Sequence, residues 1–254
     1  MNNRPLILIT NDDGVKAGGI KALIEAVRPY GDLFVVAPDS SKSGMSHAMT
    51  VKVPLHLTQV FKEEGLTIYK SNGTPADCIK IALGELLDKK PDYVLSGINH
   101  GTNSSVSAFY SGTVGGAREG AFNSIPSIGF SLCDYSLDAD FSEAVRICRQ
   151  IFEFALKNGM KPNDYYNVNI PKGDFVKGIK ICRHAKGRWV EDFEARKDPY
   201  DRTYYWLTGH FENAEPEATD TDEWALKNGY ASLSPCTVDA TCYEKLLELR
   251  NYDF

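Results

Sequence analysis

Two adjacent carboxylates follow an apolar run near the start of the sequence. The segment PLILITNDDGV, residues 5–15, places Asp12 and Asp13 directly after a run typical of a buried strand. Side by side in a confined site, each carboxylate raises the pKa of the other, and burial adds a desolvation cost to both. A divalent cation would offset these costs, because its charge keeps both carboxylates ionised. Taken alone, the same residues are also typical of an Asx-rich turn that caps the next helix.

Two further polar clusters follow apolar runs. The loop APDSSKSGMSH contains Ser43 and Gly44, and DYVLSGIN ends in Asn99, with Asn103 four residues later. In open α/β sheets, ligands bind beyond the carboxyl ends of the strands, so we expect these clusters and the acid pair to meet on one rim. Carboxylate, hydroxyl and amide oxygens suit magnesium, manganese or calcium, and no cysteine or histidine occupies the positions that would favour zinc.

A candidate anion cradle lies further along the chain. In YSGTVGGAREG, Ser111, Gly112 and Thr113 precede or open a predicted helix. Free backbone N–H groups, the positive helix end and two hydroxyls suit a phosphate group, and Gly112 permits close approach of the backbone. In isolation the same residues are typical of a Ser/Thr helix cap. A phosphate cradle beside a metal site predicts phosphoryl chemistry.

The histidines and the charged C-terminal segments indicate less. His47 and His100 follow the Ser43 loop and Asn99, yet a hydrogen-bonded structural role is the commoner one for such residues. The acidic stretch at 212–223 is expected to be a solvated loop. A solvated loop is also the default for three basic residues that could otherwise meet substrate, namely Arg183, Lys186 and Arg188.

Strand-like and helix-like segments alternate through the first part of the chain and must position these residues. Helices are predicted after the strands, and the last of them, near 140–159, has an Asp140 to Glu143 capping-box pattern. The alternation predicts a parallel sheet with helices on both faces. The predicted strands cover residues 6–10, 33–39, 92–99 and 127–132.

Composition narrows the class of protein. The chain has 254 residues, 43% hydrophobic content and a net charge of -6, which favours an ordinary globular protein and argues against a nucleic-acid polymer as partner. No apolar run approaches the roughly 20 residues of a membrane span, and we expect no membrane partner and a cytoplasmic location. The six cysteines are scattered, so we expect neither a zinc knuckle nor a disulfide framework.

Beyond residue 165 the pattern becomes less regular. We expect an α/β core at 1–164 and a β-rich C-terminal part at 165–254 that ends in a helix. The segment 198–211 is rich in aromatic residues, which favours a subunit contact. The alternative from composition is that these side chains pack on their own core. The aromatic residues are Tyr200, Tyr204, Tyr205, Trp206 and Phe211.

An ordered set of motifs resembles one known family. From residue 6 to about 236, the chain is similar to the SurE family of stationary-phase survival proteins, which are metal-dependent 5'/3'-nucleotidases. The segments that carry the resemblance are ILITNDDGV, VVAPDSSKSGMSH, GTPADC, VLSGINHGTN, YSGTVGGAREG, NVNIP and DTDEWALKNGYASLSP. The region RHAKGRW fits the family loosely, and His100 and Thr102 fill variable places, which leaves base preference open.

The resemblance implies a site and an architecture. It implies a Rossmann-like core, a C-terminal part that exchanges elements between subunits of a homodimer or homotetramer, and hydrolysis of nucleoside monophosphates, with polyphosphate cleavage left open. One divalent ion per subunit, Mg²⁺ or Mn²⁺ with Ca²⁺ in crystals, is expected on Asp12, Asp13, Ser43 and Asn99. The implied phosphate contacts are Gly44, Asn103, Ser111, Gly112 and Thr113.

In the mechanism predicted from these residues, a water attacks phosphorus in line and Asp12 or Asp13 takes its proton. An aspartyl-phosphate route ranks second. Three other classes fit less well. A receiver domain needs an acceptor aspartate where Asn99 stands, a dinucleotide-binding oxidoreductase needs GxGxxG in the first turn, and dehalogenase-type phosphatases need Asp-x-Asp.

Overall fold

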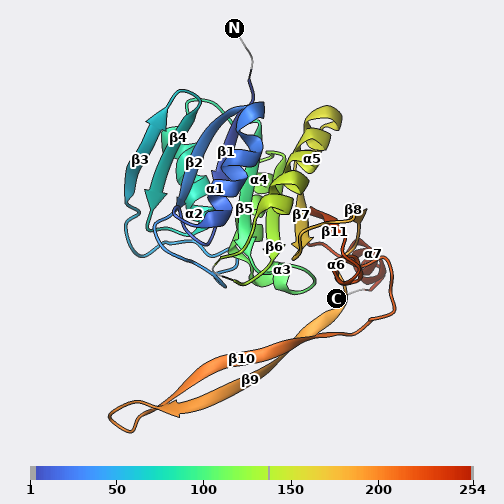
Figure 1. The fold of residues 1–254 in the computed structure, drawn as a ribbon. Coiled ribbons are helices and arrows are strands. Elements are labelled where there is room, and N and C mark those ends of the chain that lie inside the picture. Colours follow the sequence, from blue (N-terminus) through green and yellow to red (C-terminus); the bar gives the residue numbers. More distant parts are fainter. Residues whose placement is uncertain (1–3, 137, 253–254) are drawn as a thin grey trace.

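A nine-stranded sheet forms the centre of the molecule (Figure 1). The computed structural model describes residues 4–136 and 138–252. The strands of the sheet are β1 (Leu6–Thr10), β2 (Asp32–Pro38), β3 (Leu57–Glu63), β4 (Leu66–Ser71), β5 (Tyr93–His100), β6 (Ser127–Cys133), β7 (Asp164–Pro171), β8 (Ile179–Ile181) and β11 (Ala231–Thr237). Their order is β3-β4-β2-β1-β5-β6-β7-β11-β8. Neighbours from β4 to β7 run parallel, whereas β3 and β11 are antiparallel to β4 and β7.

Helices cover both faces of the sheet, which confirms the predicted α/β class. The helices are α1 (Gly18–Val27), α2 (Pro75–Ile81), α3 (Ser107–Tyr110), α4 (Gly112–Phe122), α5 (Ser142–Asn158), α6 (Asp222–Lys227) and α7 (Tyr243–Leu249), with short helical turns η1 (Arg28–Tyr30) and η2 (Ala82–Leu86). Helices α1 and α5 pack together on one face, and α2 and α4 on the other. The chain therefore forms three layers.

The central strands are buried on both faces, as is typical of parallel strands between two helical layers. Ile7 and Ile9 of β1 join Leu23 and Phe152 in the larger core cluster, and Leu8 points into the second cluster with Ile79 of α2. None of the six side chains is exposed to solvent. Burial on this scale fixes the positions of the strand ends.

Four of the predicted strands are confirmed to within one residue at either end, but other expectations are wrong. None of the predicted strands covers the polar stretch before α2, where the structure has the β3–β4 hairpin. The Asp140 to Glu143 capping box does not form. Asp140 accepts from the backbone N–H of Ser142 at 2.8 Å, while the Glu143 carboxylate accepts from Arg146 and from the N–H of Val176.

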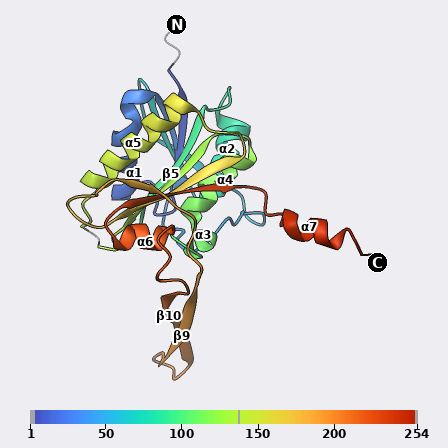
Figure 2. The same cartoon turned by 90° about the vertical axis from the view of Figure 1, so that its right-hand side faces the viewer.

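The sheet continues beyond the expected boundary at residue 164, because β7, β11 and β8 extend it. Two C-terminal elements leave it. Strands β9 (Gly187–Lys197) and β10 (Thr203–Asn213) form a long antiparallel hairpin that projects from the body, and α7 lies at the end of a separate arm (Figures 1 and 2). The division of function between residues 1–164 and 165–254 stays a prediction.

The structure also bears on the cysteines and on membrane-spanning helices. All six cysteines are free, and Cys78 and Cys148 belong to the core clusters. Among the described residues, no helix is both long and apolar enough to cross a membrane.

Candidate active site

The expected convergence of strand ends is present as a pocket of about 550 Å³. Six of the predicted site residues line it: Asp12, Ser43, Gly44, Asn99, Asn103 and Ser111. Asp13, Gly112 and Thr113 lie behind this lining, in contact with residues that belong to it. The order of the sheet explains the meeting, because β1 lies between β2 and β5 and the three parallel strands end on the same side.

A tight turn after β1 places the acid pair. Asn11 donates from Nδ2 to the carbonyl of Gly14 and accepts from its N–H, at 3.0 and 3.2 Å. Gly14 has a φ of +102°, which favours glycine. Asp12 is therefore directed into the pocket, while Asp13 turns aside and accepts from the backbone N–H of His100 at 3.1 Å.

The environment of the pair raises both pKa values. Burial, above all, raises the pKa of Asp12 to about 6. The hydrogen bond from Thr113 opposes this rise, and the charge of Asp13 adds to it. Burial also raises the pKa of Asp13, against the effect of the N–H of His100. Two neighbouring carboxylates with raised pKa values are a site that a bound cation would stabilise.

The first turn of α4 packs directly on Asp12. Thr113 donates from Oγ1 to Oδ1 of Asp12 at 2.5 Å. A Cβ atom at Gly112 would lie only 2.8 Å from the Cβ of Asp12, so only glycine fits this approach. Ser111 caps the helix and accepts from the N–H of Val114 at 3.0 Å. The helix N-terminus and the acid pair therefore belong to one site.

The other candidate ligands are held from the backbone. Asn99 donates from Nδ2 to the carbonyls of His100 and Gly101, at 3.1 and 2.8 Å, which uses both of its N–H groups. Its Oδ1 accepts no hydrogen bond from the described residues and is the atom that would face a cation. The Ser43 loop is joined to the pair, because the N–H of Lys42 donates to the carbonyl of Asp12 at 2.7 Å.

These residues fit a hard divalent cation better than zinc. Within 4–136 and 138–252, no group of three or more histidine, cysteine, aspartate or glutamate side chains lies together as metal ligands do. The donor set is instead two carboxylates with the oxygens of Ser43 and Asn99, which suits magnesium or manganese.

Asn103 is fixed by a buried polar network that sequence reasoning missed. Its backbone N–H donates to Oδ1 of Asn169 at 2.7 Å, and its Nδ2 donates to Ser131 at 2.8 Å. Asn167 donates to the carbonyl of Asn103 at 2.9 Å. The signal was present in NVNIP, where two asparagines two residues apart share one face of a buried strand.

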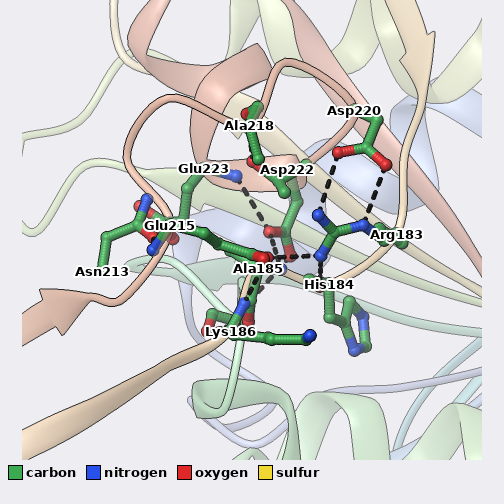
Figure 3. A network of polar contacts seen from close by, with 12 residues as sticks. Arg183, His184, Ala185, Lys186, Asn213, Glu215, Ala218, Asp220, Asp222 and Glu223 are labelled. Atoms are coloured by element: carbon green, nitrogen blue, oxygen red, sulfur yellow. Dashed lines mark hydrogen bonds and ion pairs between the residues drawn. The ribbon is translucent and has the colours of Figure 1, made fainter.

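The acidic stretch at 212–223 is not simply a solvated loop, which corrects that expectation. Asp222 is fully buried and accepts at 2.8 Å from the N–H of Ser105 and from that of Ala185. Arg183 forms ion pairs with Asp220 and Glu215 in the same polar network (Figure 3). The network holds the loop after β5 against the base of the β9–β10 hairpin.

The histidines and the remaining basic residues have local partners. His47 lies 2.8 Å from Glu119 and stacks on Phe122, a structural role as expected. His100 lies in the pocket lining, with its ring against the edge of Phe141. Arg188 pairs with Glu212. Neither Arg183 nor Arg188 lines the pocket.

Several pocket residues were not predicted. The mouth of the pocket contains Tyr110 and Tyr135, and the β9–β10 hairpin adds Trp189 near its base and Leu207 from its middle. No local pattern in the sequence indicates them, because they come from separate segments. The fold and the site together define a three-layer α/β protein with a buried acid pair beside a helix N-terminus.

The comparisons with known proteins agree with this class. A model of the family described as "Survival protein SurE" matches residues 7–191. Proteins named 5'-nucleotidase SurE from Bacteroides fragilis and Bacteroides thetaiotaomicron are 47% and 48% identical, each over 99% of this chain and over 99% and 97% of their own lengths. The crystal structure of the Sure protein from Aquifex aeolicus has a TM-score of 0.83 at 38% identity, covering 97% of this chain and 99% of that one. The chain belongs to the Survival protein SurE family.

Proposed function

We propose that the chain is a divalent-metal-dependent phosphomonoesterase that hydrolyses nucleoside 5'-monophosphates to nucleoside and phosphate. The packing of Gly112 and Thr113 on Asp12 carries the proposal, because it joins an anion-binding helix end to a buried acid pair. The relatives named 5'-nucleotidase SurE support the substrate class.

Asp12, Asp13, Ser43 and Asn99 would hold the cation. When bound, the cation would neutralise the acid pair, polarise a phosphoryl oxygen and lower the pKa of a water. Asn99 is oriented for this role by the two carbonyls that its Nδ2 contacts. The proposal names a hard divalent ion, magnesium or manganese, and does not choose between the two.

The chain's own groups would bind and orient the phosphate. The Ser111 hydroxyl and the backbone N–H groups of Gly112 and Thr113, at the N-terminus of α4, would donate to its equatorial oxygens, where charge spreads in the transition state. The N–H of Thr113 also contacts the carboxylate of Asp12. Asn103 has one further N–H on Nδ2, beyond the one given to Ser131. Gly44 would approach the phosphate through its backbone from the opposite loop.

Asp12 is the stronger of the two candidates for general base, since it lines the pocket and Asp13 lies behind the lining. Thr113 occupies its Oδ1, which leaves Oδ2 to take the proton of the attacking water. Asp13, bound to the N–H of His100, would then serve to hold the cation and the turn.

A phosphate-release screen tests the proposal. Purified protein, treated with chelator and then supplied with Mg²⁺ or Mn²⁺, is offered 5'- and 3'-monophosphates, sugar phosphates and polyphosphate. We expect release from 5'-monophosphates that requires the added ion. Full activity in chelator would contradict metal dependence, and activity restricted to sugar phosphates or polyphosphate would contradict the substrate class. Activity on 3'-monophosphates or polyphosphate, a cytoplasmic location and assembly as a homodimer or homotetramer stay predictions.

A further inference from the structure

The pocket has two chemically different parts. Its inner part is polar and contains Asp12, Asn99 and Ser111. Its mouth is aromatic, with the side chains of Tyr110, Tyr135 and Trp189 contributed by three separate segments. A volume of about 550 Å³ exceeds what a phosphate group fills and is typical of a pocket that holds a small organic ligand.

Two of the aromatic rings are held in place while keeping exposed surface. Trp189 donates from Nε1 to Oγ of Ser107 at 3.1 Å and packs edge to face with Phe211. The ring of Tyr135 lies against Gly101, where a Cβ atom would come within 2.3 Å of Cε1. Even so, Tyr135 is 71% exposed and Trp189 39% exposed, so surface of each ring is available to a ligand.

The third ring is tied to the phosphate end. Tyr110 directly precedes Ser111, and its carbonyl accepts from the N–H of Ser46 at 2.9 Å. Its side chain is 59% exposed. A ligand whose phosphate lies on the first turn of α4 would therefore extend past Tyr110 toward the mouth.

The charge of the lining favours a neutral, planar group there. Among the described residues, Asp12 is the only acidic one in the lining, and no lysine or arginine belongs to it. Stacking on aromatic side chains binds nucleobases without a strict choice of base, because every base has a π face. A second phosphate would find no lysine or arginine partner among the described lining residues.

We propose that Tyr110, Tyr135 and Trp189 form a nucleobase subsite that holds the heterocycle of the substrate by stacking. The inference rests on the proposed function, and it gives the substrate class a structural basis. Because a purine offers a larger face than a pyrimidine, the subsite favours purine nucleotides modestly.

The test compares AMP with ribose 5-phosphate, which carries the same phosphoester and lacks only the base. The quantity measured is the ratio of kcat/KM for AMP to kcat/KM for ribose 5-phosphate. We expect Tyr135→Ala and Trp189→Ala each to lower this ratio about tenfold, through KM for AMP, while Tyr135→Phe retains it. Phe61→Ala, which removes an exposed aromatic side chain from the edge strand β3, is the matched control and should leave the ratio unchanged.

An unchanged ratio in both alanine variants would overturn the subsite, and so would a parent protein that turns over the two compounds equally well. A loss of equal size for both compounds would show that the rings only support the fold.

Failure of the proposed function is separable from failure of the subsite. If the parent protein hydrolyses neither compound, adenosine alone serves as probe, through quenching of tryptophan fluorescence. Quenching that is lost in Trp189→Phe would support the subsite without any catalysis. Absence of quenching in the parent protein would overturn it.

Discussion

Asp12 lies between the end of β1 and the first turn of α4, where Thr113 donates to it and Gly112 packs against it. At the scale of single residues, the site therefore depends on close contacts with Asp12, which leave no room for a larger side chain at position 112.

Asp12→Asn or Asp13→Asn should lower phosphate release at least about 100-fold, which corresponds to roughly 3 kcal/mol of transition-state stabilisation. The amide is nearly isosteric but removes a negative charge needed to hold a cation. Steady-state phosphate release gives the loss, and circular dichroism with thermal melting verifies that the fold persists. Near-normal turnover in either variant would refute the assignment of the pair.

Gly112→Ala should reduce kcat/KM at least about tenfold. The added methyl group would meet Asp12 at 2.8 Å, so the helix end or the carboxylate must move. Gly84→Ala is the matched control, because a Cβ atom there meets nothing within 4 Å. The control should keep its activity and its stability. Equal activity of the two variants would mean that the close approach has no catalytic importance.

At the scale of elements, loops are held in place by buried carboxylates that accept backbone N–H groups. Asp222, at the start of α6, joins the loop after β5 to the base of the β9–β10 hairpin. Asp77, in the first turn of α2, forms a capping box with Thr74 and also accepts from the N–H of Thr50. Each carboxylate links segments far apart in the sequence.

Asp222→Asn should weaken phosphate binding, because the amide places a donor against the N–H of Ser105 or Ala185 and shifts the loop that carries Asn103. We expect the inhibition constant of inorganic phosphate to rise about fivefold or more, together with lower thermal stability. Asp220→Asn is the control, since Asp220 lies two residues before Asp222 and is an exposed ion-pair partner of Arg183. If Asp222→Asn only lowered the melting temperature, Asp222 would have a structural role alone.

Asp77→Asn should lower the free energy of unfolding at pH 7 by about 1 kcal/mol, the usual value of a capping interaction. Burial acts to raise the pKa of Asp77, but the hydrogen bonds from Thr50 and Thr74 outweigh it and hold the pKa below its ordinary value of 3.8. Because the pKa of Asp77 is lower in the folded protein than in the unfolded chain, the ionised carboxylate stabilises the fold at pH values above the pKa of the unfolded chain. This stabilisation is lost as the pH falls through the pKa of the folded protein. The difference between parent and variant should therefore narrow below about pH 4. Urea unfolding at pH 7, 5 and 3 measures the free energy of unfolding of both proteins. A difference between them that does not depend on pH would contradict the role of the Asp77 charge.

At the scale of the whole molecule, the hairpin and the C-terminal arm expose apolar surface. Tyr205 and Trp206 of β10 are 64% and 58% exposed, and Leu247 of α7 is 62% exposed. Figure 2 shows α7 away from the body of the molecule. Elements that leave their own core lose apolar burial unless a partner receives them.

The full-length protein should therefore sediment as a dimer or larger at micromolar concentration. Removal of apolar surface by the double change Tyr205→Ser and Trp206→Ser should weaken the assembly. This substitution is a cleaner test than truncation after Pro171, because β8 and β11 belong to the central sheet. A stable, active monomer of 28.2 kDa across dilution would refute the prediction.

The alternating strands and helices, the acid pair and the helix-capping SGT motif could all be predicted from the sequence. These are local patterns: hydrophobic periodicity, turn residues and caps act within a few residues. The sequence also favoured one rim for Asp12, Ser43 and Asn99, because parallel strands share their carboxyl ends.

The residues that complete the site from distant segments could not be predicted, because the packing of the fold brings them together. Tyr135 and Trp189 line the same pocket because separate segments are brought there by the sheet and by the network around Asp222. The β3–β4 hairpin was missed because its exposed strand β3 has little apolar periodicity, and pairing with β4 stabilises it instead. Such contacts depend on packing between segments far apart in the chain, which no local pattern records.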